Sequence, residues 1–148
     1  MLMTAANRPP VDYRLCDQTV TIYHQTGAGA GFSCIRTVFH GAFLDSQKVT
    51  TVDKTGSREG HSFLLILPSG WDNRPEWMQP DAYDAAIQTD GRFTLAPKDK
   101  VLLGEGPEIT SREQWASFLP AHTAGLVVIQ DVDPKYWQGR VCHVEAGG

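Results

Sequence analysis

The hydrophobic and polar positions alternate most regularly near the N-terminal end of the chain, over residues 19–24. Val20 and Ile22 fall on one face of an extended segment, and the residues between them fall on the other. A period of two with β-branched residues is typical of a half-buried strand. The glycine-rich segment 26–31 then predicts a turn, and residues 32–44 predict a second strand that pairs back on the first, with a bulge or bend at Gly41.

The longest predicted feature is a hairpin that runs from Ala42 to Leu67. Its turn lies over residues 53–56, where Gly56 supplies the left-handed residue that a short hairpin loop needs. The run 63–67 is apolar at every position, which is typical of a strand buried on both faces. The segment 48–58 is polar on both faces and has no core position. The sequence therefore predicts a hairpin with its base in the core and its tip projecting beyond it.

The second half of the chain predicts two short helices and three further strands. Pro80 fits the first position of a helix over 80–87, with Tyr83, Ala86 and Ile87 on one stripe. A capping-box pattern opens the second helix, which ends before a proline. Strands are predicted over 101–103, 126–133 and 140–145, with a turn over 134–139; the cap is assigned to Thr110 with Glu113, and the stop to Pro120.

The length and pattern together predict one mainly β domain. A chain of 148 residues suits a single domain that holds a core without disulfides. We expect a small antiparallel β-barrel or sandwich of six to seven strands, with a long projecting hairpin and two short helices. The predicted organisation is an N-terminal arm over 1–16 and a β-barrel domain over 17–148, which contains the hairpin 42–67 and a loop and helix insert over 69–92.

The charge and cysteine content narrow the class of protein. The formal net charge of −4 argues against a protein that coats nucleic acid, but it suits a wall past which DNA moves without sticking. Three widely spaced cysteines predict reduced thiols rather than a disulfide scaffold. Residues 1–10 lack an apolar stretch, and the longest apolar run is 63–67, so we expect neither a signal peptide nor a membrane span.

The common catalytic and metal-binding motifs do not occur in the sequence. We therefore expect no catalytic residues, no metal, no cofactor and no enzymatic activity. The five histidines form no chelating spacing, although His24, His40 and His61 would meet if their strands were neighbours. Aspartates in turns usually bond local backbone amides, and a carboxylate pair assembled from distant loops stays open as an alternative.

Two groups of residues are candidates for contacts with other chains. A hairpin tip that leaves the core is either a solvated element or one that docks on another subunit or faces a channel, because strands past a core expose unpaired backbone edges. Tryptophans in predicted loops favour interfaces unless the loops fold back and bury them. The hairpin candidates are Lys48, Val49, Thr50, Thr51, Val52, Asp53, Lys54, Thr55, Gly56, Ser57 and Arg58, and the aromatic candidates are Trp71, Trp77 and Trp137.

The order of elements resembles that of small neck proteins of tailed phages and prophages, the head–tail joining or head-closure (stopper) proteins. The resemblance covers most of the chain from Asp17 onward. It is carried by the strands 20–24 and 36–43, the long hairpin, the apolar strand 63–67 ending at Pro68, the segment Pro97-Lys98-Asp99-Lys100-Val101-Leu102-Leu103-Gly104, and the final strand pair 126–132 and 140–145.

The resemblance implies a subunit of a homo-oligomeric ring in the virion neck, made in the bacterial cytoplasm. Such a ring links the portal to the tail and retains packaged DNA. The implied partners are further copies of the chain, the portal or an adaptor, and tail proteins, with DNA passing through the lumen without sequence-specific binding and no membrane. The alternatives are a tail-terminator or minor capsid protein of the same kind of virion, or a small ligand-binding or hydrolytic β-barrel.

Overall fold

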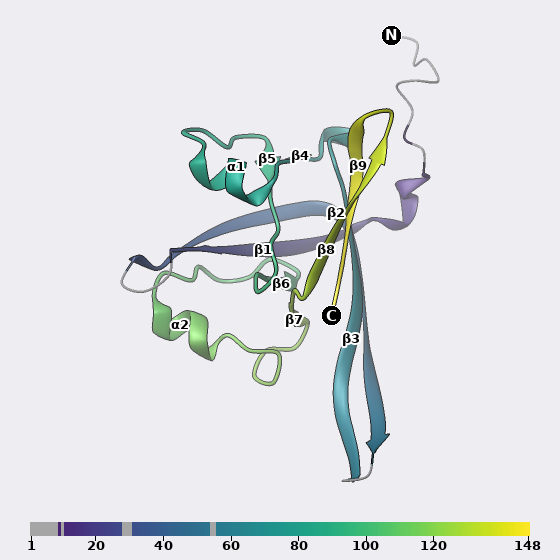
Figure 1. Cartoon of the computed structure of the whole chain (residues 1–148), viewed down its shortest axis with the longest axis vertical. Helices are drawn as coiled ribbons and strands as arrows, with labels where there is room; N and C mark the ends of the chain where they lie inside the picture. The colour runs from purple at the N-terminus through teal and green to yellow at the C-terminus, as the bar shows by residue number, and fades with distance from the viewer. Residues whose placement is uncertain (1–8, 10, 28–30, 54–55) are drawn as a thin grey trace.

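The computed structural model describes the backbone of residues 9, 11–27, 31–53 and 56–148, and their side chains except at 47–53 and 56–61 (Figure 1). The described residues form nine strands, of which two are long at 21 and 13 residues, and two six-residue α-helices. In chain order the elements are η2 (Tyr13–Leu15), β1 (Gln18–Thr26), β2 (Ser33–Asp53), β3 (Gly56–Pro68), η4 (Trp71–Asn73), β4 (Glu76–Trp77), α1 (Pro80–Ala85), β5 (Arg92–Phe93), β6 (Lys100–Leu103), α2 (Arg112–Ser117), β7 (Leu126–Val128), β8 (Asp131–Trp137) and β9 (Arg140–Gly147).

Seven strands form one antiparallel sheet in the order β7-β6-β1-β2-β3-β9-β8, and β4 and β5 form a separate parallel pair. The prediction of a mainly β fold is confirmed. The sheet does not close into the predicted barrel. Its two edge strands, β7 and β8, are nevertheless consecutive in the chain, joined by Ile129 and Gln130, and the Gln130 amide donates to the carbonyl of Gly147. The sheet is therefore folded on itself but open along one seam.

The strand β2 belongs to both halves of this folded sheet. Its first half, up to Ala42, pairs with β1, and its second half, from Phe43 onward, pairs with β3. Pairing with β1 skips one residue of β2 at Gly41, whose φ is +93°. A bulge with a left-handed residue bends a strand, so the bend predicted at Gly41 is confirmed. Figure 1 shows β1 and β3 running in clearly different directions on either side of this bend.

The side chain of Arg74 holds the bend in place. Its Nε donates to the carbonyl of Gly41 over 2.8 Å, its Nη1 to that of Trp71 and its Nη2 to that of Cys16, each over 3.0 Å. The guanidinium therefore satisfies three carbonyls from three segments. A Cβ at Gly41 would lie 2.6 Å from Arg74 Nε, so the position requires glycine for its space as well as for its φ.

The main hydrophobic core lies between the two halves of the sheet and is closed by the β4–β5 pair. Strands on both sides of the bend contribute to it, and nine of its side chains are fully buried. At about 25 cal/mol per Å² of apolar surface, this burial is the main stabilising contribution. The cluster comprises Val20, Ile22, Phe39, Ala42, Leu44, Leu65, Leu67, Trp77, Phe93, Leu95, Val101, Val127, Ile129, Val144 and Ala146.

The prediction that β1 is half-buried is wrong, because every residue from Val20 to His24 is buried. The outer face of β1 is covered by α2 and by the loop after β6. The Tyr23 ring packs edge-on against Phe118 at 4.9 Å, and the Thr21 hydroxyl donates to the carbonyl of Gly104. The alternation of residue types shows which positions are polar but not which positions other segments cover. It therefore could not predict that α2 and the loop after β6 bury the outer face of β1.

For the base of the hairpin the sequence predicted too much burial rather than too little. Leu65 and Leu67 are fully buried, but Leu64 is 41% exposed, so the strand is not buried on both faces. Leu64 and Ile66 project to the outer side of the sheet, where Ile66 lines a shallow apolar groove beside Leu15. The long paired hairpin itself is as predicted, with register pairs from Phe43–Ile66 to Asp53–Gly56.

Two helix predictions need correction. The capping box of α2 is formed by Ser111 and Gln114, one residue after the predicted pair, with Ser111 Oγ accepting from the Gln114 amide over 3.1 Å. The first helix ends at Ala85 rather than at residue 87, and Ile87 is completely exposed instead of lying on the buried stripe. Of the three residues of that stripe, only Tyr83 is buried.

The predicted turn over 134–139 is also wrong. The strand β8 continues through Pro134 to Trp137, and the turn is Gln138–Gly139, both with positive φ. Proline lacks a backbone donor, but β8 lies at the edge of the sheet, where one of its sides needs no donor.

We predict that Gly41→Ala destabilises the protein more than Gly139→Ala does. Both glycines have positive φ, which costs an alanine about 1–2 kcal/mol. A Cβ at Gly139 meets no atom within 4 Å, whereas a Cβ at Gly41 collides with Arg74. We therefore expect an additional loss of about 1 kcal/mol or more for Gly41→Ala in urea unfolding. Equal losses in the two variants would show that Arg74 does not constrain the bend.

Candidate functional site

The outer part of the β2–β3 hairpin, which we call the arm, comprises residues 47–53 and 56–62. The pairing of β2 with β1 ends at Ala42, and the pairing of β3 with β9 begins at Leu64, so the described arm backbone pairs only within itself. Figure 1 shows the arm extending well away from the other strands. Each arm strand therefore presents one edge of backbone donors and acceptors without a partner strand.

The predicted contact residues 48–58 lie in the arm. Their backbone forms the paired strands, but their side chains lie outside the described residues, as do Lys54 and Thr55 altogether. The arm can be judged only by its backbone. A ribbon of two strands is marginally stable in water by itself, so the base of the hairpin or another chain must stabilise it.

The structure separates the three predicted interface tryptophans. Trp77 is buried in the core, where its ring packs against Phe93 at 5.6 Å, so it is not an interface residue. Trp71 and Trp137, which are 66 positions apart in sequence, line one small pocket of about 90 Å³. Trp137 is 41% exposed and its neighbour Tyr136 is 65% exposed.

The two tryptophans belong to a surface that we call the aromatic patch, which consists of Trp71, Trp137 and Arg140, all lining this pocket. The Trp71 indole N–H donates to the carbonyl of Cys142 over 3.2 Å, which fixes its ring against β9. The Arg140 side chain is 76% exposed and lines the same pocket. Aromatic and arginine side chains are enriched in the centres of protein interfaces. The patch therefore fits a protein-contact surface.

A buried charged cluster, which the sequence did not reveal, is centred on His24. Its Nδ1 lies 2.7 Å from Asp99 Oδ2, and its Nε2 lies 2.7 Å from Asp84 Oδ1. The side chains of His24 and Asp99 are 4% and 3% exposed, and that of Asp84 is 40% exposed. Since an ionised carboxylate only accepts, both contacts are hydrogen bonds when each ring nitrogen carries a proton, that is, when His24 is an imidazolium between two carboxylates.

Burial and the neighbouring carboxylates shift the pKa of His24 in opposite directions. Burial by itself lowers the pKa of His24, but the hydrogen bonds and negative charges of Asp99 and Asp84 outweigh burial, so the pKa of His24 is raised above its ordinary value. In the protonated form both nitrogens are engaged, so His24 has no free lone pair for a proton or a metal. The cluster consequently joins segments and is not arranged for general base catalysis.

Part of this cluster can be traced in the sequence pattern. His24 follows Val20 and Ile22 at a spacing of two, and Asp99 precedes Val101 at the same spacing. The antiparallel register that pairs Ile22 with Val101 continues to place His24 opposite Asp99. A histidine on a core face needs a polar partner, and the cross-strand position supplies one. Asp84 had no such signal, because its position depends on the path of the insert 69–92.

A second buried network ties the N-terminal segment to β9. The Tyr13 hydroxyl lies 2.7 Å from His143 Nδ1, and His143 Nε2 lies 3.1 Å from Glu145 Oε2. Tyr13 and Cys16 are buried, so the last residues of the N-terminal segment, which the sequence predicted to be separate from the domain over 1–16, pack on the domain. Burial and hydrogen bonding raise the pKa of Tyr13 well above its usual range, so Tyr13 remains a neutral phenol.

The remaining candidates for chemistry are dispersed. His24 and His40 lie near opposite ends of the β1–β2 ladder, opposite Ile35 and Thr19, so the three strand histidines do not converge. All three cysteines are free thiols. Within the described part of the chain, no three His, Cys, Asp or Glu side chains are arranged to hold a metal ion.

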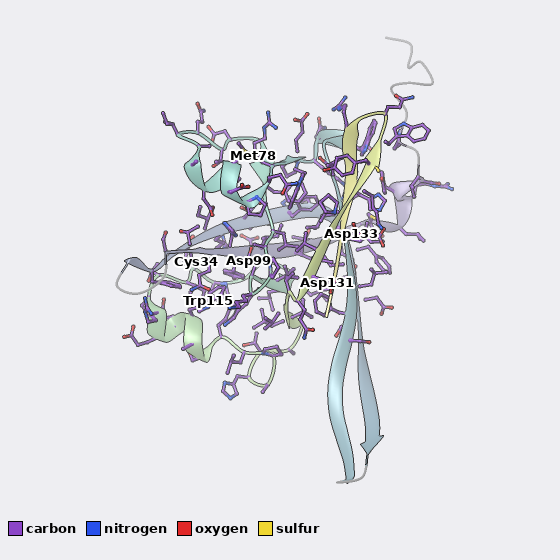
Figure 2. All side chains as sticks on the ribbon, viewed as in Figure 1. Cys34, Met78, Asp99, Trp115, Asp131 and Asp133 are labelled. Carbon is purple, nitrogen blue, oxygen red and sulfur yellow. The ribbon has the colours of Figure 1, made fainter. Side chains whose placement is uncertain are left out.

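Cys34 lies under α2 beside Trp115 (Figure 2). Burial, followed by the negative charge of Asp99, raises the pKa of the Cys34 thiol to about 11, so it is a poor nucleophile. Nearby, Lys100 Nζ donates to the carbonyls of Trp115 and Phe118 over 2.6 Å each and lies 4.2 Å from the centre of the Trp115 ring. Lys100 therefore secures the C-terminal end of α2 to the sheet.

We predict that Tyr13→Phe lowers the free energy of unfolding by about 1–2 kcal/mol, because the substitution leaves the buried His143 nitrogen without its partner. Tyr136→Phe is the matched control, since Tyr136 is 65% exposed. Urea unfolding of both variants tests this. Equal stabilities would show that the hydroxyl of Tyr13 contributes nothing to anchoring the N-terminal segment.

The sequence matches the model of DUF6751, a family of unknown function, over residues 15–148, and the chain belongs to this family. The comparison with curated proteins found no match, and neither did the comparison with solved structures. Among the described residues, no helix combines the length and the apolar composition needed to cross a membrane.

Proposed function

We propose that this member of DUF6751 is a structural assembly protein that forms a homo-oligomeric ring and acts as a head-closure (stopper) subunit in the neck of a tailed phage. In this role the ring joins the portal to the tail and retains packaged DNA. The observation that carries the proposal is the arm, whose described backbone pairs only within itself.

An arm of this kind is suited to contact another chain, because its backbone edges have no partner strand within its own chain. The described backbone of the arm extends two edges that pair with no third strand. Natural proteins blunt or cover such edges, because exposed ones pair with other chains. When the arm of one copy meets a different surface of the next copy, the contact is heterologous, and repetition of that contact closes a ring or extends a filament.

Two further features support an assembly role. The aromatic patch brings Trp71 and Trp137 together on the body of the protein, away from the fully buried core, and offers a second contact surface. The formal net charge of −4 suits a channel wall that DNA crosses without adhering.

We predict that deletion of residues 49–57 abolishes assembly and leaves the body folded. The deletion joins Lys48 to Arg58, so the Lys48–His61 pair would be closed by a three-residue loop that contains Gly60. Mass measurement by light scattering, with the portal protein present and absent, should show ring-sized particles for the intact chain and monomers for the shortened one. Circular dichroism and thermal unfolding should be unchanged.

The outcomes of this deletion distinguish the possible roles of the arm and of the protein. A shortened chain that still forms rings on the portal would show that the arm is not the contact. A shortened chain that fails to fold would show that the arm belongs to the core. Particles that form on tail tubes or on capsid shells instead of the portal would indicate a tail-terminator or minor capsid protein.

We further predict that Trp137→Ser raises the protein concentration required for assembly at least tenfold. Tyrosine and tryptophan at interface centres often cost about 2 kcal/mol or more when truncated. Ile87→Ser is the matched control, because Ile87 is a fully exposed apolar residue outside the arm and the aromatic patch. Equal effects of the two changes on the assembly concentration would remove the aromatic patch from the interface.

A further inference from the structure

We propose that His24 is a proton-controlled latch, which holds α1 against the sheet while its ring is protonated and releases the helix when the ring loses a proton. The latch is a conformational device of the monomer. It goes beyond the proposed assembly role and does not depend on it.

The contacts of α1 carry this inference. In the described part of the chain, the side-chain hydrogen bond and the aromatic contact that join α1 to the sheet both go to His24. Asp84 Oδ1 lies 2.7 Å from His24 Nε2, and the Tyr83 ring lies edge-on to the imidazole at 5.8 Å. The other acidic side chain of the helix, Asp81, accepts from the amide of Ala82 within α1 itself. A helix of six residues is far too short to be stable alone, so its order depends on such tertiary contacts.

The two carboxylates of the cluster are not equivalent. Asp99 is 3% exposed and also accepts from the backbone amides of Ala96 and Gln25, over 2.8 and 3.2 Å. Asp84 is 40% exposed and can turn toward water. When the imidazolium loses one proton, the remaining proton stays on Nδ1, because the buried Asp99 pays the larger penalty for losing its donor. Nε2 then presents a lone pair to the Asp84 carboxylate, and the contact becomes repulsive.

The direction of the pH response follows from the pKa of His24. Burial opposes the charged form, but Asp99 and Asp84 raise the pKa above its ordinary value. The latch is therefore fully closed below the ordinary histidine pKa and is lost as pH rises through the raised value.

Other charged groups near the cluster do not reverse this direction. The Cys34 thiol on β2 stays neutral over the same range, since its pKa is raised to about 11 by burial and then by Asp99. The Lys100 amine on β6 is directed to the carbonyls at the end of α2, and burial lowers its pKa. Lys98, on the same loop as Asp99, is exposed to solvent, which screens its charge.

Hydrogen exchange measured at a series of pH values tests the latch on the intact protein. After correction for the intrinsic exchange rate, the protection of the amides in residues 81–86 should be constant at low pH. It should then fall, by at most about tenfold per pH unit, between the ordinary histidine pKa and the raised pKa of His24, and it should level off above the raised value, as expected for an opening coupled to one proton. The amides of Leu65 and Leu67 in the core serve as the internal reference and should remain protected. The imidazole nitrogen shifts of His24 give its titration directly.

Two variants of the same charge change separate the latch from a general loss of stability. In Asp84→Asn the new amide can accept from the protonated ring or donate to the neutral one, so the protection of α1 should become independent of pH. Asp81→Asn removes an equal charge from the same helix without touching His24, and its pH response should match that of the intact sequence.

Three results would overturn the proposal. Protection of α1 that stays flat while His24 titrates would mean that the helix does not respond to the ring. A fall in protection that lies outside the pH range between the ordinary histidine pKa and the measured pKa of His24 would assign the response to another group. A pH response that survives in Asp84→Asn would show that this carboxylate does not form the latch.

Discussion

The whole fold depends on one strand serving two halves of a sheet. β2 pairs with β1 up to Ala42 and with β3 from Phe43 onward, and the change of partner is possible only because the backbone bends at Gly41. Arg74 stabilises the bend by binding carbonyls of Gly41, Trp71 and Cys16, which brings the insert and the N-terminal segment to the same corner. The core forms between the two halves that this bend brings together.

The same strand also connects the body to the arm. In the body, buried polar groups are joined in pairs and networks: His24 holds a helix and a loop, Tyr13 holds the N-terminal segment, and Lys100 holds α2. Each of these contacts fixes a peripheral segment on the sheet, because buried charges and hydroxyls are stable only with partners. The arm extends from this rigid base. An element that is anchored firmly at one end and unpaired along its edges is suited to contact another chain.

Local sequence patterns predicted where strands and bends lie better than they predicted which residues are buried. Alternation located β1, and the glycine at 41 located the bend, because both depend on the chain's own geometry. Burial was misjudged in both directions. β1 is covered on its outer face by α2, and Leu64 is left uncovered, although neither fact depends on the residues of the strand itself. The predicted interface tryptophans divided in the same way, since Trp77 entered the core while Trp71 and Trp137 met in one pocket.

The sequence by itself determined a mainly β chain with a long hairpin and an acidic balance, since periodicity, turn residues and charge are properties of local segments. Only the tertiary structure decided that the sheet folds without closing and that the arm lacks a third strand. It also decided that an insert aspartate reaches a histidine 60 positions away. These features depend on which strands become neighbours and which surfaces are covered, and contacts between distant segments are not encoded in the pattern of either segment alone.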